Sequence, residues 1–311
     1  MAHTHDHQDH ASGAHAHAHG PIDYSRAFAI GVAANLAYVA VQTGYGLQAN
    51  SVALLADAAH NLSDVLGLVL AWGAATLAKR LPSQRFTYGL RRSSILAALL
   101  NAAFLLLVTG GIAWEAIQRF LEPVDVTGAT VIWVAALGIA VNGGSALLFL
   151  SGRKHDLNVR GAFMHMAADA VVSLGVVLAG FGMVFTGWLW LDPAVSLLVS
   201  AVIVVGAWSL LRDSVRLALD AVPEGVDIDK VRAYLCELPG VVEIHDLHVW
   251  GMSTTETALT AHLVMPGGHP GDAFMAAVST RLHEEFHIGH STVQVETNPD
   301  HPCVLAPESV V

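Results

Sequence analysis

Two apolar segments of the chain each contain a histidine and an aspartate four residues apart. His60 and Asp64 lie in AAHNLSDVLGLVLAW, and His165 and Asp169 lie in FMHMAADAVVSLGVVLAG. In a helix this spacing places the two side chains of a pair on one face, about one turn apart. A charge near the centre of a bilayer costs roughly 2.5 kcal/mol or more, so ionisable residues there indicate a functional site. Two such helices face to face offer two imidazoles and two carboxylates, a ligand set that suits a divalent metal ion.

The ligand types narrow the choice of metal. Two imidazoles and two carboxylates in tetrahedral geometry favour zinc and also fit cobalt, cadmium or iron, whereas magnesium and calcium prefer oxygen ligands alone. Neither segment contains a lysine or arginine that would neutralise its aspartate, so a bound cation is the expected counter-charge. Because histidine must be neutral to bind metal, protons compete with the ion. The pattern predicts a site that exchanges zinc for protons.

The two His–Asp pairs need membrane helices to position them, and the composition indicates that the chain forms such helices. Of 311 residues, 54% are hydrophobic and 13% are charged, where a soluble domain has about a quarter charged. Six apolar stretches are each long enough to cross a bilayer core, which takes about 20 residues. They are residues 26–47, 52–78, 93–118, 127–151, 160–185 and 188–211.

The positive charges set the orientation of these six helices. With the N-terminus inside, all lysines and arginines up to residue 216 fall on the inner side except Arg119. This bias predicts that both termini are cytoplasmic. No cleavable signal peptide is visible at the N-terminus, and the compact chain favours a bacterial plasma (inner) membrane.

The segments outside the helices divide the chain into four parts. Residues 1–24 are a His-rich tail expected to be disordered, residues 25–212 form the six-helix transport domain, and residues 299–311 form a C-terminal tail. Residues 213–298 are expected to form a small α+β domain of order αββαβ. Its predicted elements are a helix at 227–238, strands at 241–250 and 256–265, a helix at 272–287, and a strand at 292–296.

Several of these segments resemble the cation diffusion facilitator family of proton-coupled zinc transporters. The resemblance rests on SVALLADAAHNLSDVLGLVLAW, RFTYGLRR, HMAADAVVSLGVVLAG, LDPAVSLLVS and the C-terminal HDLHVW. It implies an α-helical membrane protein with six transmembrane helices, a ferredoxin-like cytoplasmic domain and a homodimer. The transport ligands that it implies are His60, Asp64, His165 and Asp169, a combination similar to that of zinc-selective members.

The resemblance also implies a zinc site in the cytoplasmic domain. By motif match, HDLHVW supplies His245, TAHLVM supplies His262 and VQVETNP supplies Glu296. His269 and Cys303 are further candidates. Some members have a histidine where Glu296 stands, so the ligand set of this site remains open.

Other polar residues carry weaker expectations. Asn35, Tyr38, Gln42 and Tyr45 form one stripe on the first helix and are expected to face the bundle interior. The N-terminal histidines (His3, His5, His7, His10, His15, His17 and His19) are expected to collect metal weakly. The loop KRLPSQRFTYGLRR has no histidine or aspartate, so we expect no zinc site in it. Its Arg85, Tyr88 and Arg91 are instead expected to contact lipid headgroups and the cytoplasmic domain, and His155 is expected to have no special role.

Together these features predict a proton-coupled antiporter that exports zinc, with cadmium or cobalt as further cargoes, by alternating access. An intramembrane metallohydrolase is disfavoured because the chain has no HExxH motif, and a channel because a four-ligand site holds its ion tightly. A metal sensor that does not transport stays open as an alternative. Two cysteines exclude a disulfide framework, and no basic stripe indicates a nucleic-acid partner.

Overall fold

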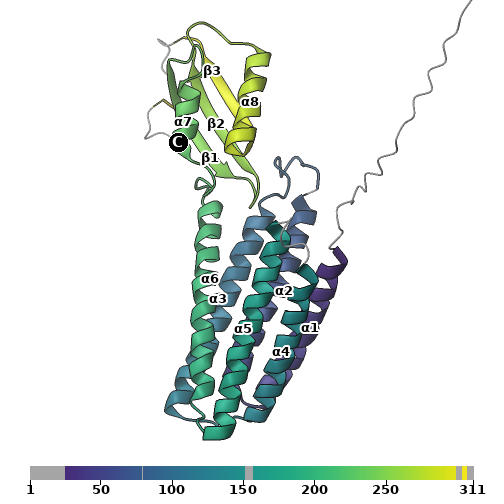
Figure 1. The fold of residues 1–311 in the computed structure, drawn as a ribbon. Helices are drawn as coiled ribbons and strands as arrows, with labels where there is room; N and C mark the ends of the chain where they lie inside the picture. Colours follow the sequence, from purple (N-terminus) through teal and green to yellow (C-terminus); the bar gives the residue numbers. More distant parts are fainter. Residues whose placement is uncertain (1–24, 79, 151–156, 299–302, 307–311) are drawn as a thin grey trace, which may run out of the picture.

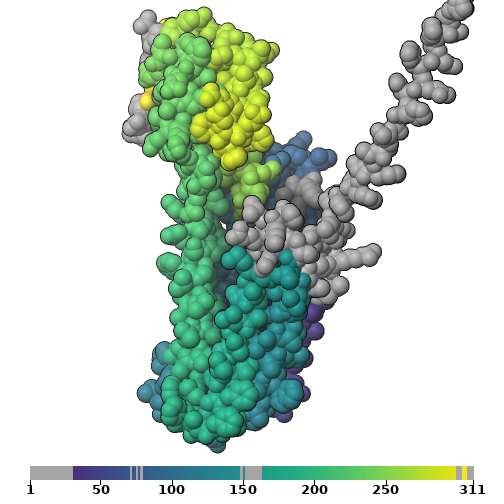
Figure 2. Space-filling view, in the orientation of Figure 1, coloured from purple at the N-terminus to yellow at the C-terminus, as the bar shows by residue number. Residues whose placement is uncertain are grey.

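A computed structural model describes residues 25–78, 80–150, 157–298 and 303–306. It shows a bundle of long helices with a small α+β domain at one end, which we call the domain end (Figure 1). The space-filling view shows this domain as a separate lobe (Figure 2). The expectations for residues 1–24 and for His155 lie outside the described residues.

Six helices form the bundle, as predicted. They are α1 (Ser25–Gln48), α2 (Val52–Ala78), α3 (Ser93–Leu121), α4 (Gly128–Phe149), α5 (Leu157–Thr186) and α6 (Leu191–Ala218). Among the described residues, α2 to α6 are long and apolar enough to cross a membrane. The 24 residues of α1 are also long enough, but the polar stripe interrupts their apolar sequence. Its Asn35, Tyr38 and Gln42 are buried as expected, whereas Tyr45 is exposed and does not face the interior.

The start of α2 is held by a side chain from another helix. Ser51 precedes α2, and its Oγ accepts a hydrogen bond from the Leu54 backbone N–H at 3.2 Å, as an N-cap does. The buried Asp192 of α6 accepts a second bond from the Val52 backbone N–H at 2.8 Å and a third from the Ser51 hydroxyl. A carboxylate at a helix N-terminus also interacts favourably with the helix dipole. Asp192 therefore fixes the first turn of α2 against α6.

Small residues bring α4 and α5 close together. A Cβ atom on Gly180 would lie 2.7 Å from Cγ1 of Ile132 and 3.3 Å from its backbone nitrogen. Only glycine allows the two backbones to approach this closely. This contact fixes α5, which carries His165 and Asp169, against α4.

The α+β domain has the predicted element order. It consists of α7 (Ile228–Cys236), β1 (Glu243–Gly251), β2 (Thr257–Val264), α8 (Asp272–Phe286) and β3 (Ile288–Glu296). In the sheet, β2 lies between β1, to which it is antiparallel, and β3, to which it is parallel. β3 begins four residues earlier than predicted because Ile288 lies in the domain core and pairs with Thr257.

The helices α7 and α8 pack against one face of this sheet. Leu259, Ala261 and Leu263 of β2 belong to the core that they cover. Because side chains alternate along a strand, His262 points to the opposite face. The face of the sheet that the helices leave uncovered therefore carries His262.

The last bundle helix extends into this domain. α6 continues to Ala218, seven residues beyond the stretch predicted from hydropathy. Four of these seven residues are polar (Arg212, Asp213, Ser214 and Arg216), so they continue the helix outside the apolar layer. The chain leaves the helix at Asp220, which has a left-handed backbone with φ of 58°.

Candidate metal centres

The two His–Asp pairs meet between α2 and α5. His60 Nε2 lies 3.1 Å from Asp169 Oδ1, and His165 Nε2 lies 3.2 Å from Asp64 Oδ2, so each histidine approaches the aspartate of the other helix. Within each helix the pairs are 3.7 Å and 3.6 Å apart. The donor atoms of His60, Asp64 and Asp169 all lie within 4.8 Å of one another. His165 approaches this group of three through Asp64 and Asp169 but is not a member of it. The structure therefore brings the four candidate ligands to one place between the two helices.

This point lies deep in the bundle. His60 is eight residues, about 12 Å, from the start of α2, and Asp64 is fourteen residues, about 21 Å, from its end. Asp169 is 3% exposed, whereas His165 is 41% exposed. Oδ2 of Asp169 and Nδ1 of His60 are buried without a hydrogen bond in the described residues. Buried polar atoms of this kind fit a site whose remaining partner is a cation.

A layer of buried polar side chains lies behind the site, toward the far end of the bundle. Gln42 Nε2 donates to Asp57 Oδ2 at 2.6 Å, and the Ser173 hydroxyl donates to the same oxygen at 3.4 Å. Asn61 Nδ2 donates to Gln42 Oε1 at 3.3 Å, which fixes the orientation of the Gln42 amide. The side chains of this layer are buried and closed to solvent.

The two halves of the site helices differ in burial. Toward the far end, Leu54 and Asp57 of α2 and Val176 of α5 are fully buried. Toward the domain end, Val69 of α2 and Met164 of α5 are more than half exposed. The buried polar layer therefore separates the site from the far end of the bundle.

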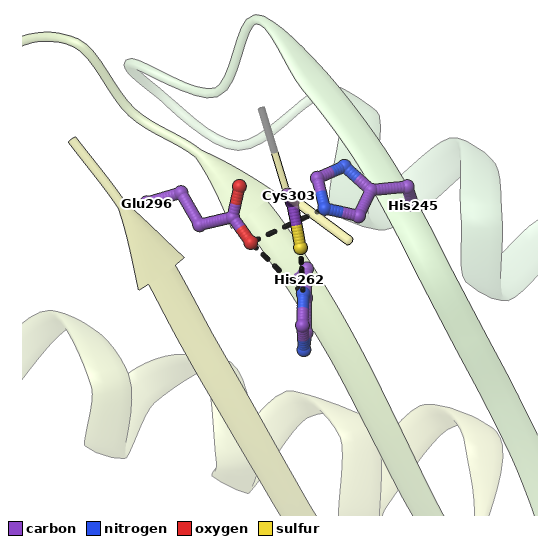
Figure 3. A group of neighbouring side chains, drawn as sticks. All are labelled: His245, His262, Glu296 and Cys303. Atoms are coloured by element: carbon purple, nitrogen blue, oxygen red, sulfur yellow. Dashed lines mark hydrogen bonds and ion pairs between the residues drawn. The ribbon is translucent and has the colours of Figure 1, made fainter. Parts of the chain in front are cut away.

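A second group of metal-ligating side chains lies on the open face of the α+β domain. His245 of β1, His262 of β2 and Glu296 of β3 point toward one another and toward Cys303 (Figure 3). Glu296 Oε1 lies 3.2 Å from His245 Nε2 and 2.9 Å from His262 Nδ1. Cys303 Sγ lies 3.6 Å from His262 Nδ1. All four donor atoms lie within 4.8 Å of one another, and we call this group the domain cluster.

The cluster arises from strand pairing. His245 and His262 are paired neighbours on antiparallel strands, and directly opposed residues have Cβ atoms about 5 Å apart. His269, the remaining candidate, is not part of the cluster, and its Nδ1 accepts a hydrogen bond from the Gly271 backbone.

The charges within the cluster influence one another. Burial raises the pKa of Glu296, whereas its hydrogen bonds with Cys303 and His245 lower it. The lowering effects together are larger, so the pKa of Glu296 lies below its usual value. A hydrogen bond with the Leu305 backbone lowers the pKa of Cys303, but the Glu296 carboxylate and burial outweigh it and raise the pKa. The thiol is therefore protonated at neutral pH until a metal displaces its proton.

Two polar residues beside the cluster were not singled out from the sequence. Asp246 Oδ1 lies 2.8 Å from His248 Nε2, and Asp246 Oδ2 lies 3.4 Å from His262 Nε2. The strand pairing is irregular between His245 and His248, and Asp246 has a φ of 51°. Such a bulge re-aims a side chain, so Asp246 comes to face His262. The adjacency of His and Asp in HDLH was the signal available in the sequence.

A six-helix bundle with a set of candidate metal ligands inside it, joined to a small α+β domain, is the architecture of a class of helical membrane transporters for metal cations. The family model for the cation efflux transmembrane domain matches residues 28–217, and that for the cation efflux protein cytoplasmic domain matches residues 223–298. The chain therefore belongs to the cation efflux, or cation diffusion facilitator, family and to its zinc-transporting subgroup.

Curated relatives resemble the chain over nearly its whole length. The zinc transporter ZitB of Escherichia coli is 36% identical over 306 residues, which cover 97% of this chain and 94% of the relative. The cadmium, cobalt and zinc/H(+)-K(+) antiporter of Bacillus subtilis is 33% identical, covering 87% and 89%. The metal cation efflux system protein CzcD of Cupriavidus metallidurans is 33% identical, covering 92% and 90%. The chain is a metal cation transporter and not an enzyme.

Proposed function

We propose that the protein is a proton-coupled antiporter that exports zinc through a tetrahedral site formed by His60, Asp64, His165 and Asp169. The observation that carries this proposal is the convergence of the four side chains between α2 and α5. Two neutral imidazoles and two carboxylates match zinc in ligand type and bring its charge to zero. Cadmium and cobalt accept the same ligands and are secondary cargoes.

Alternating access moves the ion across the membrane. We infer that zinc enters from the domain end, because the buried layer around Asp57 separates the site from the far end. A second conformation opens the far end and closes the domain end, and the transporter shifts between the two populations. Protons arriving from the far side compete for the histidines and release the metal.

The orientation follows from charge and family. We place the α+β domain and both termini in the cytoplasm of a bacterium, with the bundle in its inner membrane, because nearly all positive charges lie at the domain end. The protein works as a homodimer. Zinc bound to the domain cluster of His245, His262, Glu296 and Cys303 biases the transporter toward activity.

The decisive experiment measures zinc uptake into proteoliposomes under an imposed pH gradient, with a fluorescent indicator inside. Asp64→Asn and Asp169→Asn each remove one charged ligand while preserving side-chain shape. We expect each to lower the zinc transport rate by at least about 100-fold, because loss of a partner that only orients a metal ligand already costs about 10- to 100-fold. Because protons leave the lumen in exchange for the zinc that enters it, zinc entry by the unmodified protein is expected to alkalinise the lumen.

Asp125→Asn is the matched control, because this exposed aspartate lies in the segment between α3 and α4. It should transport at the unmodified rate. Melting temperatures of all variants in detergent establish that they are folded. Full-rate transport by either site variant would refute the site assignment, and transport without proton movement would refute the coupling.

A further inference from the structure

Asp246 interrupts the regular alternation of side chains along β1. Ile244 and Leu247 both pack against the core of the domain, on the face of the sheet that the helices cover. In a regular strand, residues three apart point to opposite faces. One residue between them is therefore extra, and the sheet shows it as a shift of register between His245 and His248.

The extra residue brings a carboxylate to the uncovered face of the sheet. In a regular strand, the residue after His245 would point into the core. Asp246 instead has a left-handed backbone with φ of 51°, and its carboxylate reaches His262 on the uncovered face. This backbone conformation is unfavourable for residues other than glycine, although aspartate tolerates it better than most. Strained residues of this kind cluster at functional sites, because the surrounding structure must hold them there.

The carboxylate of Asp246 lies between two imidazoles. His248 Nε2 donates a hydrogen bond to Asp246 Oδ1 at 2.8 Å, and His262 Nε2 lies 3.4 Å from Asp246 Oδ2. Because an ionised carboxylate can only accept hydrogen bonds, it favours a hydrogen on each of these two nitrogens. The Asp246 side chain is only 12% exposed, so water competes little for these contacts.

The two ring nitrogens of His262 face different carboxylates. Nδ1 faces the domain cluster, where Glu296 Oε1 lies 2.9 Å away, and the other ring nitrogen points away from the cluster (Figure 3). A neutral imidazole carries one hydrogen, and a metal binds the nitrogen that lacks it. Glu296 favours the hydrogen on Nδ1, where it would block the metal. Asp246 favours the hydrogen on Nε2, which leaves Nδ1 free.

We propose that Asp246 is a positioning residue of the domain cluster, which holds the hydrogen of His262 on Nε2 and so presents Nδ1 to zinc. This inference rests on the proposed binding of zinc by the cluster and adds the residue that prepares one of its ligands. A carboxylate behind a metal-ligating histidine fixes the ring and makes the ligand more basic. The hydrogen bond from His248 holds the carboxylate in turn. His245 differs, because its Nδ1 is buried without a hydrogen bond in the described residues.

The test measures zinc binding at the cluster of the full-length protein through the thiol of Cys303. Alkylation of this thiol by iodoacetamide is located by mass spectrometry and followed at a series of buffered free zinc concentrations. The concentration that halves the alkylation rate gives the zinc affinity of the cluster. Cys236 is exposed on α7 and lies outside the cluster, so its alkylation is the internal control.

Two substitutions separate the carboxylate from the backbone that carries it. Asp246→Gly removes the carboxylate and suits the left-handed backbone, so the bulge is preserved. We expect it to weaken zinc binding by about 10- to 100-fold, the cost of losing such a partner. Asp246→Asn keeps an acceptor oxygen and should bind zinc within about fivefold of the unmodified protein, because a neutral acceptor is weaker but remains in place. Asp229→Asn, at an exposed position of α7, should leave the affinity unchanged.

A second measurement locates the hydrogen on His262 and needs no metal. Nitrogen NMR of protein with isotopically labelled histidines distinguishes the two neutral forms of the ring in alkaline buffer. His262→Gln identifies the resonances of this residue. We expect the hydrogen on Nε2 in the unmodified protein and on Nδ1 in Asp246→Gly.

These measurements separate the role of Asp246 from the binding of zinc itself. An unchanged zinc affinity in Asp246→Gly, or the same ring form in both proteins, would overturn the positioning role. Absence of zinc protection at Cys303 in the unmodified protein would refute zinc binding by the cluster, and the inference with it. Neither result would alter the proposed transport of zinc through the bundle, which the proteoliposome assay tests separately.

Discussion

At the scale of single residues, the two candidate metal centres differ in ligand chemistry. The centre in the bundle combines imidazoles and carboxylates only, whereas the domain cluster adds the sulfur of Cys303. Thiolate is a soft ligand that holds zinc and cobalt more tightly than carboxylate does. The domain cluster is therefore suited to retaining its ion, and the centre in the bundle is suited to releasing it.

Cys303→Ser should therefore change the domain cluster in a visible way. With cobalt as the probe, the unmodified protein should show the near-ultraviolet charge-transfer absorption of a cobalt–thiolate bond, and the variant should lack it. We expect affinity to fall by about tenfold, equivalent to roughly 1.4 kcal/mol. Because the raised pKa of Cys303 keeps the thiol protonated, cobalt must displace that proton. Affinity of the unmodified protein should rise with pH more steeply than that of the variant.

The chain offers a matched control for this substitution. Cys236, the other cysteine, is exposed on α7 and lies outside the cluster. Cys236→Ser should leave both the absorption and its pH dependence unchanged. An unaltered cobalt spectrum in Cys303→Ser would show that the sulfur is not a ligand.

At the scale of elements, the position of α2 depends on Asp192. This carboxylate from α6 caps the first turn of the helix that carries His60 and Asp64. Ser196 of α6 adds a hydrogen bond to the Val52 carbonyl at 3.3 Å. A change at the start of α2 would therefore shift both ligands together.

Asp192→Ala should lower stability more than Asp192→Asn. The alanine variant leaves the Val52 N–H and the Ser51 hydroxyl buried without partners, at a cost of about 2 to 3 kcal/mol. The asparagine variant keeps an acceptor oxygen for one of them. Melting temperatures in detergent measure the difference, and equal melting temperatures for the two variants would contradict the capping role.

At the scale of the whole molecule, the bundle divides into parts that differ in their attachment to the domain. α3 and α6 pack extensively against each other, as do α4 and α5. α6 continues into the domain, and the start of α3 contacts it through Arg91, through Ser94 and through the ion pair of Arg92 with Asp220. We therefore expect α3, α6 and the domain to stay together as one unit during transport, while α4 and α5 move against them.

A disulfide between the domain and α3 tests this division. The variant carries Ser94→Cys and Thr254→Cys, and its native cysteines are replaced by serine. We expect its transport rate in the oxidised form to lie within about twofold of its rate after reduction, because both positions belong to one unit. The rate is measured before and after reduction, with Ser94→Cys alone as the control. A large loss of transport on oxidation, reversed by a reductant, would show that the domain moves relative to α3.

The fold was largely predictable from the sequence, and the exceptions have physical causes. Hydropathy identifies six helices because each must cover a bilayer, but it misses the extension of α6 to Ala218, which lies beyond the apolar layer. Helical spacing predicted a buried stripe on α1. Tyr45, which lies in the last turn of the helix, is exposed and so does not belong to that buried stripe. The early start of β3 depends on pairing with β2, which no local pattern reveals.

The sequence alone identified the candidate ligands His60, Asp64, His165 and Asp169. Helical periodicity and the cost of burying charge in lipid are properties of a single segment, so both can be read without knowing how the helices pack. Only the tertiary structure decided that each histidine approaches the aspartate of the other helix and that a buried polar layer lies behind the site. Packing between segments also brought Asp246 to His262 and Asp192 to the start of α2. Each of these contacts joins residues of separate elements, and its geometry depends on how those elements pack and bend.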